Sequence, residues 1–260
     1  MRSVLDHQWI ARCDAQIEEL EADQLPDGPL QLLREYCDTP ELVSLLESSI
    51  EILEPRAREL NRLRDLRETI SKLGGCEFNQ SGAAIFELRF LEGLVSASAE
   101  HRLDVELFPR VSESGSNVEA KIRSSDRWVY LEAKALGYTA RDWFGETGTF
   151  HHSESSEERQ LLNALREKVK MGKQLALVPT GEPGVLSLAL GYCATPLNAP
   201  RLIQGILRDG MEGLAAVLLF EGRLCRVPPL LICNPAAING LSPQEADAIK
   251  GLRFSSVSSR

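Results

Sequence analysis

The sequence predicts an α/β protein in which a helical N-terminal region, residues 1–75, precedes residues 76–260, an α/β region with a mixed sheet flanked by helices. Two observations lead to this prediction. Hydrophobic residues make up 43% of the 260-residue chain and charged residues 26%, as in ordinary globular proteins. Apolar residues keep helical spacing up to residue 75, whereas short apolar runs bounded by turn residues alternate with helical segments after it.

The N-terminal region shows two kinds of helix signal. Thr39-Pro40 has the form of an N-cap followed by proline at the first helical position, and Pro55 predicts a second helix start. The apolar stripe after Pro55 consists of Leu60, Leu63, Leu66, Ile70 and Leu73, and Gly74-Gly75 is expected to end that helix. Six basic residues decorate this helix: Arg56, Arg58, Arg62, Arg64, Arg67 and Lys72. We interpret them as a solvated face balanced by Glu59, Asp65 and Glu68, with a phosphate-facing arm as the alternative. The stripe predicts burial against the rest of the chain or against a second copy, which leaves open a homodimer through the N-terminal helices.

Helices and strands alternate after residue 82. The predicted helices cover 83–97, 157–177, 200–209 and a last segment that opens with the capping-box pattern Ser242-Pro243-Gln244-Glu245. The predicted strands cover 103–111, 117–123, 127–136, 185–192, 214–220 and 230–233. A polar loop over 137–156 follows the third strand, and loops of this length in compact domains are often functional.

The charge balance restricts the functions open to the chain. Its 29 Lys and Arg residues stand against 38 Asp and Glu residues, a formal net charge of −9. A protein that coats nucleic acid is basic, so nucleic-acid binding here requires a local basic groove or a metal ion. The chain has no GxxxxGK[ST] phosphate loop, GxGxxG turn, GxSxG elbow or HExxH motif, which excludes those common chemistries.

Cysteine usage and hydropathy predict a cytoplasmic protein. The six cysteines form no CxxC pair and are interpreted as reduced, mostly buried thiols. No apolar run approaches the roughly 18–20 residues that a membrane-spanning helix needs, so no membrane partner is expected. Charges are scattered through the first 14 residues, which is unlike a secretory signal.

Paired polar residues on neighbouring strands form the candidate site. Period two places Glu132 and Lys134 on one side of the third strand, where a carboxylate can hold a divalent cation beside an ammonium group. The preceding strand brings Asn117 and Glu119 to the same edge. The helix before the sheet adds Glu87 and, about a turn and a half later, Glu92.

Four segments carry a resemblance to a known family: FELRFLEGL in the first of these helices, SNVEAKI and VYLEAKAL in the second and third strands, and KVKMGKQLA in the next helix. In their order and spacing, residues 82–192 resemble the PD-(D/E)XK nuclease superfamily. The resemblance implies a restriction-endonuclease-like αβββαβ core. It also implies cleavage of phosphodiester bonds with Mg²⁺ (or Mn²⁺), held by an Asp and by the Glu of the ExK motif.

Carried over to this chain, the resemblance makes Glu132 the metal-binding carboxylate, Lys134 the catalytic lysine and Glu87 the acid of the first helix. Asn117 stands where the family has its Asp, and an amide oxygen binds Mg²⁺ more weakly than a carboxylate does. Glu119 is the alternative ligand. A lower-ranked register takes Asp104 with Glu119-Ala120-Lys121, but it leaves no strand between the helix and the acidic strand.

The helix after the motif supplies Lys168, Lys170, Lys173 and Gln174. They are expected either to contact nucleic-acid phosphates or to form a solvent-facing patch. The resulting functional prediction is a Mg²⁺-dependent nuclease acting on DNA. One alternative is a catalytically degenerate nuclease-like module that binds nucleic acid or a protein partner, and the other is a scaffold whose α/β part is purely structural.

Overall fold

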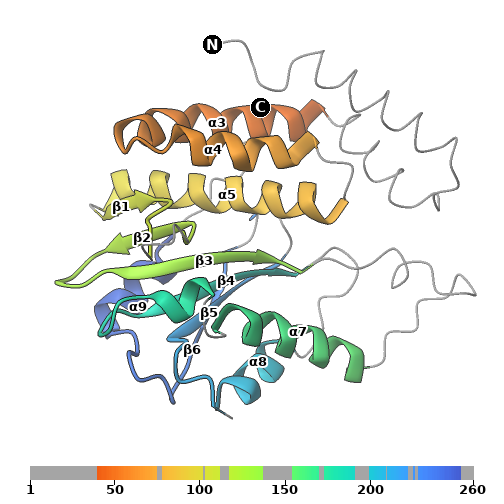
Figure 1. Cartoon of the computed structure of the whole chain (residues 1–260), viewed down its shortest axis with the longest axis vertical. Coiled ribbons are helices and arrows are strands. Elements are labelled where there is room, and N and C mark those ends of the chain that lie inside the picture. The colour runs from red at the N-terminus through yellow and green to blue at the C-terminus, as the bar shows by residue number, and fades with distance from the viewer. Residues whose placement is uncertain are drawn as a thin grey trace, which may run out of the picture.

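The protein consists of layers of helices on both sides of one sheet (Figure 1). The computed structural model describes residues 40–74, 78–101, 103–111, 117–136, 154–169, 173–190, 199–208, 210–221, 225 and 228–252. Helix α5 (Phe78–His101) covers one face of the sheet, and α3 (Pro40–Glu59) and α4 (Leu63–Ser71) lie on the outer side of α5. Helices α7 (Glu154–Val169) and α8 (Ala199–Arg208) cover the other face. The predicted α/β fold with a mixed sheet flanked by helices is confirmed.

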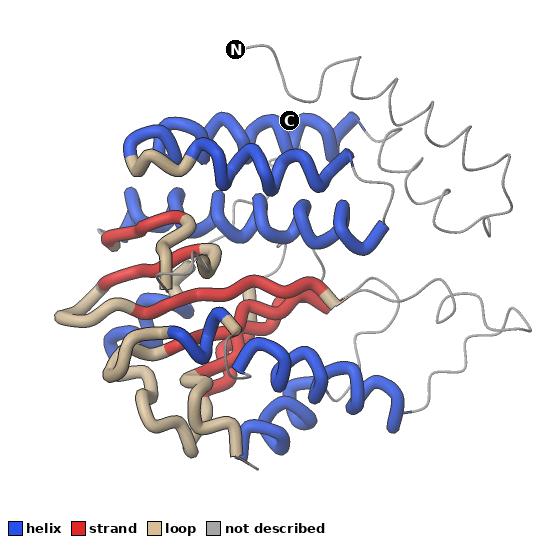
Figure 2. Tube along the Cα trace, viewed as in Figure 1, coloured by secondary structure: helices blue, strands red, loops and turns tan. Residues whose placement is uncertain are grey.

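The sheet has six strands in sequence order: β1 (Asp104–Leu107), β2 (Ala120–Arg123), β3 (Val129–Ala135), β4 (Gly184–Leu190), β5 (Ala216–Glu221) and β6 (Leu230–Cys233). The first three are antiparallel, β3, β4 and β5 are parallel, and β6 is antiparallel to β5. Parallel neighbours need a crossover connection, and α7 and α8 lie in the connections before β4 and β5 (Figure 2).

The first two strands are shorter than the sequence predicts. β1 ends at Leu107 because Phe108 has a left-handed backbone (φ 49°) and Pro109, which follows, has no N–H to donate to a ladder. Asn117 is not part of β2, and its only strand-like pairing in the described structure is an isolated bridge to Arg110. The predicted strands over 103–111 and 117–123 are therefore wrong at these ends.

The helical region also divides at a different place. Pro55 lies inside α3 rather than at a helix start, and the break comes at Asn61, which adopts a left-handed conformation (φ 56°) that Asn tolerates well. A short 3₁₀ turn, η1 (Lys72–Gly74), follows α4. The predicted helix over 157–177 is two elements, α7 and the 3₁₀ helix η2 (Gln174–Leu177). Lys173 precedes η2 in an extended conformation, so the α-helix does not continue through it.

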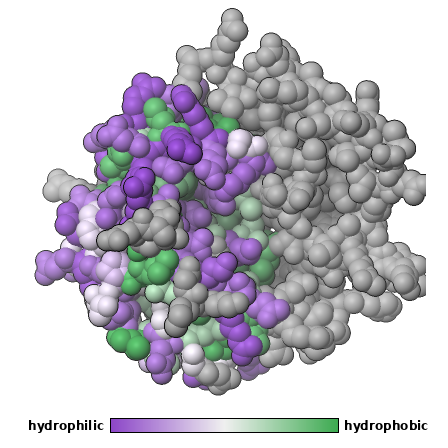
Figure 3. All heavy atoms as spheres, viewed as in Figure 1, coloured by the Kyte–Doolittle hydropathy of each residue, from purple (hydrophilic) through white to green (hydrophobic). Residues whose placement is uncertain are grey.

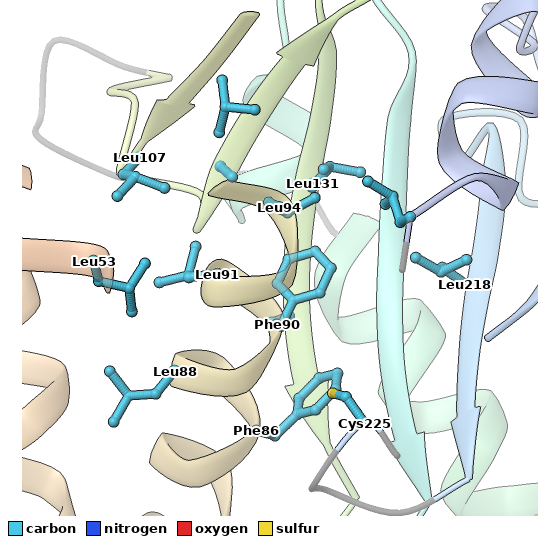
Figure 4. Packing of buried hydrophobic residues seen from close by; sticks show 14 of the residues in the cluster. Leu53, Phe86, Leu88, Phe90, Leu91, Leu94, Leu107, Leu131, Leu218 and Cys225 are labelled. Carbon is cyan, nitrogen blue, oxygen red and sulfur yellow. The ribbon is translucent and has the colours of Figure 1, made fainter. Parts of the chain in front are cut away.

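One hydrophobic core joins the N-terminal helices to the sheet. Leu53 of α3 packs with Leu88 and Leu91 of α5, whose opposite side carries Phe86 and Phe90 toward the strands (Figure 4). The rings of Phe86 and Phe90 meet Phe220 of β5 edge-on, with centroids 5.2 and 6.0 Å away. The apolar stripe predicted after Pro55 belongs to the same cluster: Leu66, Ile70 and Leu73 are buried, and Leu60 and Leu63 partly so. The stripe is thus used inside the chain, which leaves the predicted homodimer without the surface that suggested it.

The C-terminal part follows the local signals closely. In α9 (Pro243–Lys250) the Ser242 hydroxyl accepts a hydrogen bond from the Glu245 N–H, and the Glu245 carboxylate accepts one from the Ser242 N–H, which confirms the capping box. Arg127, just before β3, donates to both carboxylate oxygens of Glu245 at 2.7 and 2.8 Å and to the Gly240 carbonyl at 2.6 Å. These bonds hold α9 against the turn between β2 and β3.

The visible described surface is predominantly hydrophilic over α3 and α4, and its apolar residues form small separate patches (Figure 3). Cys225 is buried and Cys233 exposed, and both are free thiols. Within the described ranges, no helix combines the length and the apolar character needed to cross a membrane. The helical pattern before Thr39, most of the 137–156 loop and Lys170 lie outside the described residues.

Candidate functional site

Strand β3 presents alternate residues to two different hydrophobic cores. Val129, Leu131 and Ala133 belong to the core on the α5 side, whereas Tyr130 belongs to the core on the α7–α8 side. This alternation confirms the predicted division of faces, and it places Glu132 and Lys134 on the α7–α8 side of the sheet. Glu132 is only 1% exposed and Lys134 is exposed, so the strand carries a buried carboxylate followed by an accessible ammonium group.

Glu119 lies where β2 separates from β3. The two strands pair Ala120 with Leu131, and the same register continued by one residue sets Glu119 opposite Glu132. The facing pattern breaks at this point, because Ala120 packs in the α5-side core and Val118 in the α7–α8-side core. The Glu119 side chain occupies the gap in the ladder, and its Oε2 accepts a hydrogen bond from the Ala133 N–H at 2.7 Å. A carboxylate thus lies against the backbone of β3 between Glu132 and Lys134.

Glu87 is an acid with a strongly raised pKa that lies close enough to Glu119 to be affected by its charge. Its side chain is 14% exposed. Burial raises its pKa, and the negative charge of Glu119 raises it further; the nearby Lys72 ammonium and a hydrogen bond with Thr69 lower it, and the net pKa is about 7. Lys72 Nζ lies 3.5 Å from Glu87 Oε2. Glu87 is therefore a carboxyl group that exchanges its proton near neutral pH, a property that is enriched at functional sites.

Asn117 contacts the N-terminal helices rather than Glu132. Its Nδ2 donates to Asp65 Oδ1 of α4 at 3.4 Å, and its Oδ1 is buried with no hydrogen-bond partner among the described residues. A buried acceptor in this state calls for an explanation, such as an ion, a water molecule or a ligand group. The amide therefore has one end held by the protein and an oxygen still available.

These placements bring some of the predicted residues together and separate others. Glu87 comes from α5, which covers the face of the sheet opposite to the Glu132 side chain. Glu119 lies between them, where β2 separates from β3. Glu92, the second acid of the same helix, is buried in an ion pair with Arg89 and accepts a hydrogen bond from Ser49 of α3. It faces the N-terminal helices and is not part of this edge.

The lower-ranked register is not assembled. Asp104 pairs across the strands with Arg123, 2.6 Å away, and 59% of its side chain is exposed. Lys121 bonds to Glu106 at 2.9 Å and lies over the Trp128 ring, 4.5 Å from its centroid. Asp104 of β1 and Lys121 of β2 are thus engaged in cross-strand pairs, whose β2 members Arg123 and Lys121 lie four and two residues beyond Glu119.

The predicted basic residues are only partly placed. Lys168 lies in α7, while Lys173 is exposed and Gln174 half-buried at the start of η2. η2 packs at the beginning of β4, where a Cβ on Gly184 would lie 3.3 Å from Leu175, and Gly184 pairs with Tyr130. Lys173 and Gln174 therefore lie near the beginning of β3, whereas Lys134 lies near the other end of that strand.

The oxygens at this edge suit a hard divalent cation in type. Carboxylates of Glu119 and Glu132 and the unpartnered amide oxygen of Asn117 are the ligands that Mg²⁺ and Mn²⁺ prefer. One Glu119 oxygen accepts the hydrogen bond from the Ala133 N–H. Among the described residues, no group of three or more His, Cys, Asp or Glu side chains is arranged to hold a metal. Any metal site here would therefore depend on the amide of Asn117 as well as on carboxylates.

Three residues that the sequence did not predict as site residues border this region: Asp65 and Thr69 of α4, and Lys72 at the start of η1. Asp65 contacts Asn117, and the other two contact Glu87. Their spacing of four and three residues places them on one side of the helix, next to the apolar stripe. The sequence signal that could have identified them is that polar residues lie on the buried side of an amphipathic helix.

Comparisons with known proteins add no assignment. No family model matches the chain, and no curated protein or solved structure matches it at a significant level.

Proposed function

We propose that the chain is a metal-dependent nuclease that hydrolyses phosphodiester bonds in DNA. The order α5, β1, β2, β3, α7, β4 and its antiparallel–antiparallel–parallel pairing support an αβββαβ core of PD-(D/E)XK type. The ExK residues Glu132 and Lys134 lie on the central strand of this unit. The expected acidic residues of the preceding helix and strand border the same strand.

A single observation carries the proposal: the position of the Glu119 carboxylate. It is bonded to the β3 backbone between Glu132 and Lys134, and its charge raises the pKa of Glu87. Glu119 therefore lies between an acid of α5 and an acid of β3 that approach from opposite faces of the sheet. Lys72 offsets part of the charge of Glu87, yet burial and the charge of Glu119 still raise the Glu87 pKa, and raised carboxyl pKa values are enriched at functional sites.

The roles of the residues follow from their placement. Glu132, Glu119 and Oδ1 of Asn117 would hold Mg²⁺ or Mn²⁺, which when bound lowers the pKa of a coordinated water and screens phosphate charge. The exposed Lys134 ammonium would stabilise the negative charge that develops on the phosphate. Glu87, with its pKa near 7, can take up or release a proton at the pH of the reaction.

The test is a cleavage assay on supercoiled, linear and single-stranded DNA and on RNA, with Mn²⁺ or Mg²⁺ and an EDTA control. Lys134→Ala should lower the single-turnover rate by at least about 100-fold and leave DNA affinity within a few-fold, because the charge acts in the transition state. Lys250→Ala is the matched control, since Lys250 is an exposed lysine of α9 bonded only weakly to Asp247 at 3.7 Å. Cleavage by wild type that EDTA does not stop, or equal rates for the two variants, would refute the proposed mechanism.

The second candidate is a nuclease-like module that binds nucleic acid or a protein without cutting. Two features favour it: Asn117 supplies an amide in place of a carboxylate, and Glu119 spends one oxygen on the backbone. It predicts no cleavage of any substrate and no calorimetric signal with Mn²⁺. Cleavage that depends on Lys134 would exclude it.

A further inference from the structure

The contact between α4 and the start of β2 joins two residues far apart in sequence. Asp65 and Asn117 are 52 positions apart, and the Asn117 amide nitrogen lies 3.4 Å from Asp65 Oδ1. The same helix contacts Glu87 through Thr69, and Lys72, the next residue after the helix, pairs with Glu87. One side of α4 therefore touches both the amide and the perturbed acid of the candidate site.

The chemistry of this contact fixes the orientation of the Asn117 amide. An ionised carboxylate only accepts hydrogen bonds, so the amide must turn its NH₂ end toward Asp65. The oxygen is then on the other side, where it is buried and has no partner among the described residues. A neutral or apolar residue at position 65 would leave the two ends of the amide free to exchange places.

We propose that Asp65 is a positioning residue of the site: it holds the Asn117 amide with the oxygen presented to a divalent cation, and it carries the negative charge that position 117 lacks. This inference rests on the proposed metal-dependent function. It also explains why an amide stands at position 117. An aspartate there would place two carboxylates within hydrogen-bond distance of each other, with Arg62, the residue before α4, 4.0 Å from Asp65.

The experiment exchanges the two side chains in the full chain. The variants are Asp65→Asn, Asn117→Asp and the double exchange Asp65→Asn/Asn117→Asp. Arg62→Gln is the control, because it removes the ion pair to Asp65 but keeps the bond to Asn117. Two quantities are measured for each protein: Tm in EDTA, and Mn²⁺ affinity by calorimetry.

Each variant has a distinct expected result. Asp65→Asn should weaken Mn²⁺ binding about 10- to 100-fold, the usual effect of losing a residue that orients a ligand. Asn117→Asp alone should lower Tm in EDTA by about 2–4 °C through repulsion between the carboxylates. The double exchange should recover both quantities, because an amide at 65 can donate to a carboxylate at 117. Arg62→Gln should bind Mn²⁺ within about twofold of wild type, since the Asp65–Asn117 bond is intact.

Three different results would overturn the inference. If wild type binds Mn²⁺ and Asp65→Asn binds it equally well, Asp65 has no positioning role, even if its Tm changes, and the proposed function stands. If wild type binds no Mn²⁺, the proposed function fails and the role of Asp65 fails with it. Loss of affinity in Asp65→Asn without recovery in the double exchange would also refute the exchange of charge between the two positions.

Discussion

Replacing Glu87 by glutamine tests whether the buried negative charge of this residue lowers the free energy of unfolding. The Glu87 pKa lies at about 7 in the folded protein, against 4.5 for an ordinary glutamate, with burial as the main cause and the charge of Glu119 as the second. A carboxyl group whose pKa is raised by folding binds more protons in the folded than in the unfolded state between these two values. The free energy of unfolding therefore falls as pH rises from 4.5 to 7 and is lowest above 7.

The size of the effect follows from the shift. A difference of about 2.5 pKa units corresponds to about 3 kcal/mol, and little of it is screened because 14% of the side chain is exposed. Glutamine keeps the volume and removes the charge, but it also loses the ion pair with Lys72, worth at most about 1 kcal/mol. The stability of Glu87→Gln relative to wild type should thus increase by about 2–3 kcal/mol between pH 5 and pH 8.5.

Urea unfolding in EDTA at several pH values measures this difference, since EDTA removes any contribution from bound metal. Glu68→Gln is the control, because it makes the same charge change at an exposed position of α4. Glu119→Gln should reduce the pH dependence of wild type without abolishing it, because burial of Glu87 remains. The difference in free energy of unfolding between Glu87→Gln and wild type should grow with pH. A difference that is the same at pH 5 and 8.5, or that decreases as pH rises, would refute the raised pKa of Glu87.

Three further predictions concern neighbouring parts of the structure. Glu132→Gln should weaken Mn²⁺ binding at least about tenfold in calorimetry. Its Tm in EDTA should change little, because the amide keeps the packing of a side chain that is 1% exposed. Unchanged Mn²⁺ affinity would show that Glu132 is not part of the site. Burial would raise the pKa of Glu245, but hydrogen bonds from Arg127, the Ser242 N–H and two serine hydroxyls outweigh it and lower the pKa to about 2. The carboxylate thus stabilises the fold above pH 4.5 and loses this effect as pH falls toward 2, so Glu245→Gln should cost about 3 kcal/mol in urea unfolding at pH 7 and under about 1 kcal/mol at pH 2.5; equal costs would contradict the shift. Leu53→Ala should cost about 2–5 kcal/mol and preserve one transition by both circular dichroism and tryptophan fluorescence, whereas two separate transitions would show that α3 folds apart from the sheet.

The local patterns of the sequence predicted much of the architecture. The alternation of β3 placed Glu132 and Lys134 on one face, and the Ser242–Glu245 box located the start of α9. Both signals are complete within a few residues, because strand period and helix capping are set by neighbouring backbone geometry. The order of helices and strands followed for the same reason.

The errors lie where backbone conformation or helix continuity depends on distant contacts. Pro55 is a strong local signal for a helix start, yet α3 continues through it to Glu59. Ala57, two residues after Pro55 in the same helix, is fully buried. The chain turns instead at Asn61. The predicted 157–177 helix is likewise divided into α7 and η2, and Leu175 of η2 packs at Gly184. The spacing of apolar residues along the helix does not predict this contact.

The sequence by itself determined which elements form and which polar residues share a strand face, since these depend on periods of two and 3.6 residues. Only the tertiary structure decided what the polar residues do to one another. It brought Asp65 to Asn117 across 52 positions, set Glu119 into the gap between β2 and β3, and buried Glu87 deeply enough to move its pKa to about 7. Burial and charge proximity are properties of the packed chain, and no pattern of neighbouring residues specifies them.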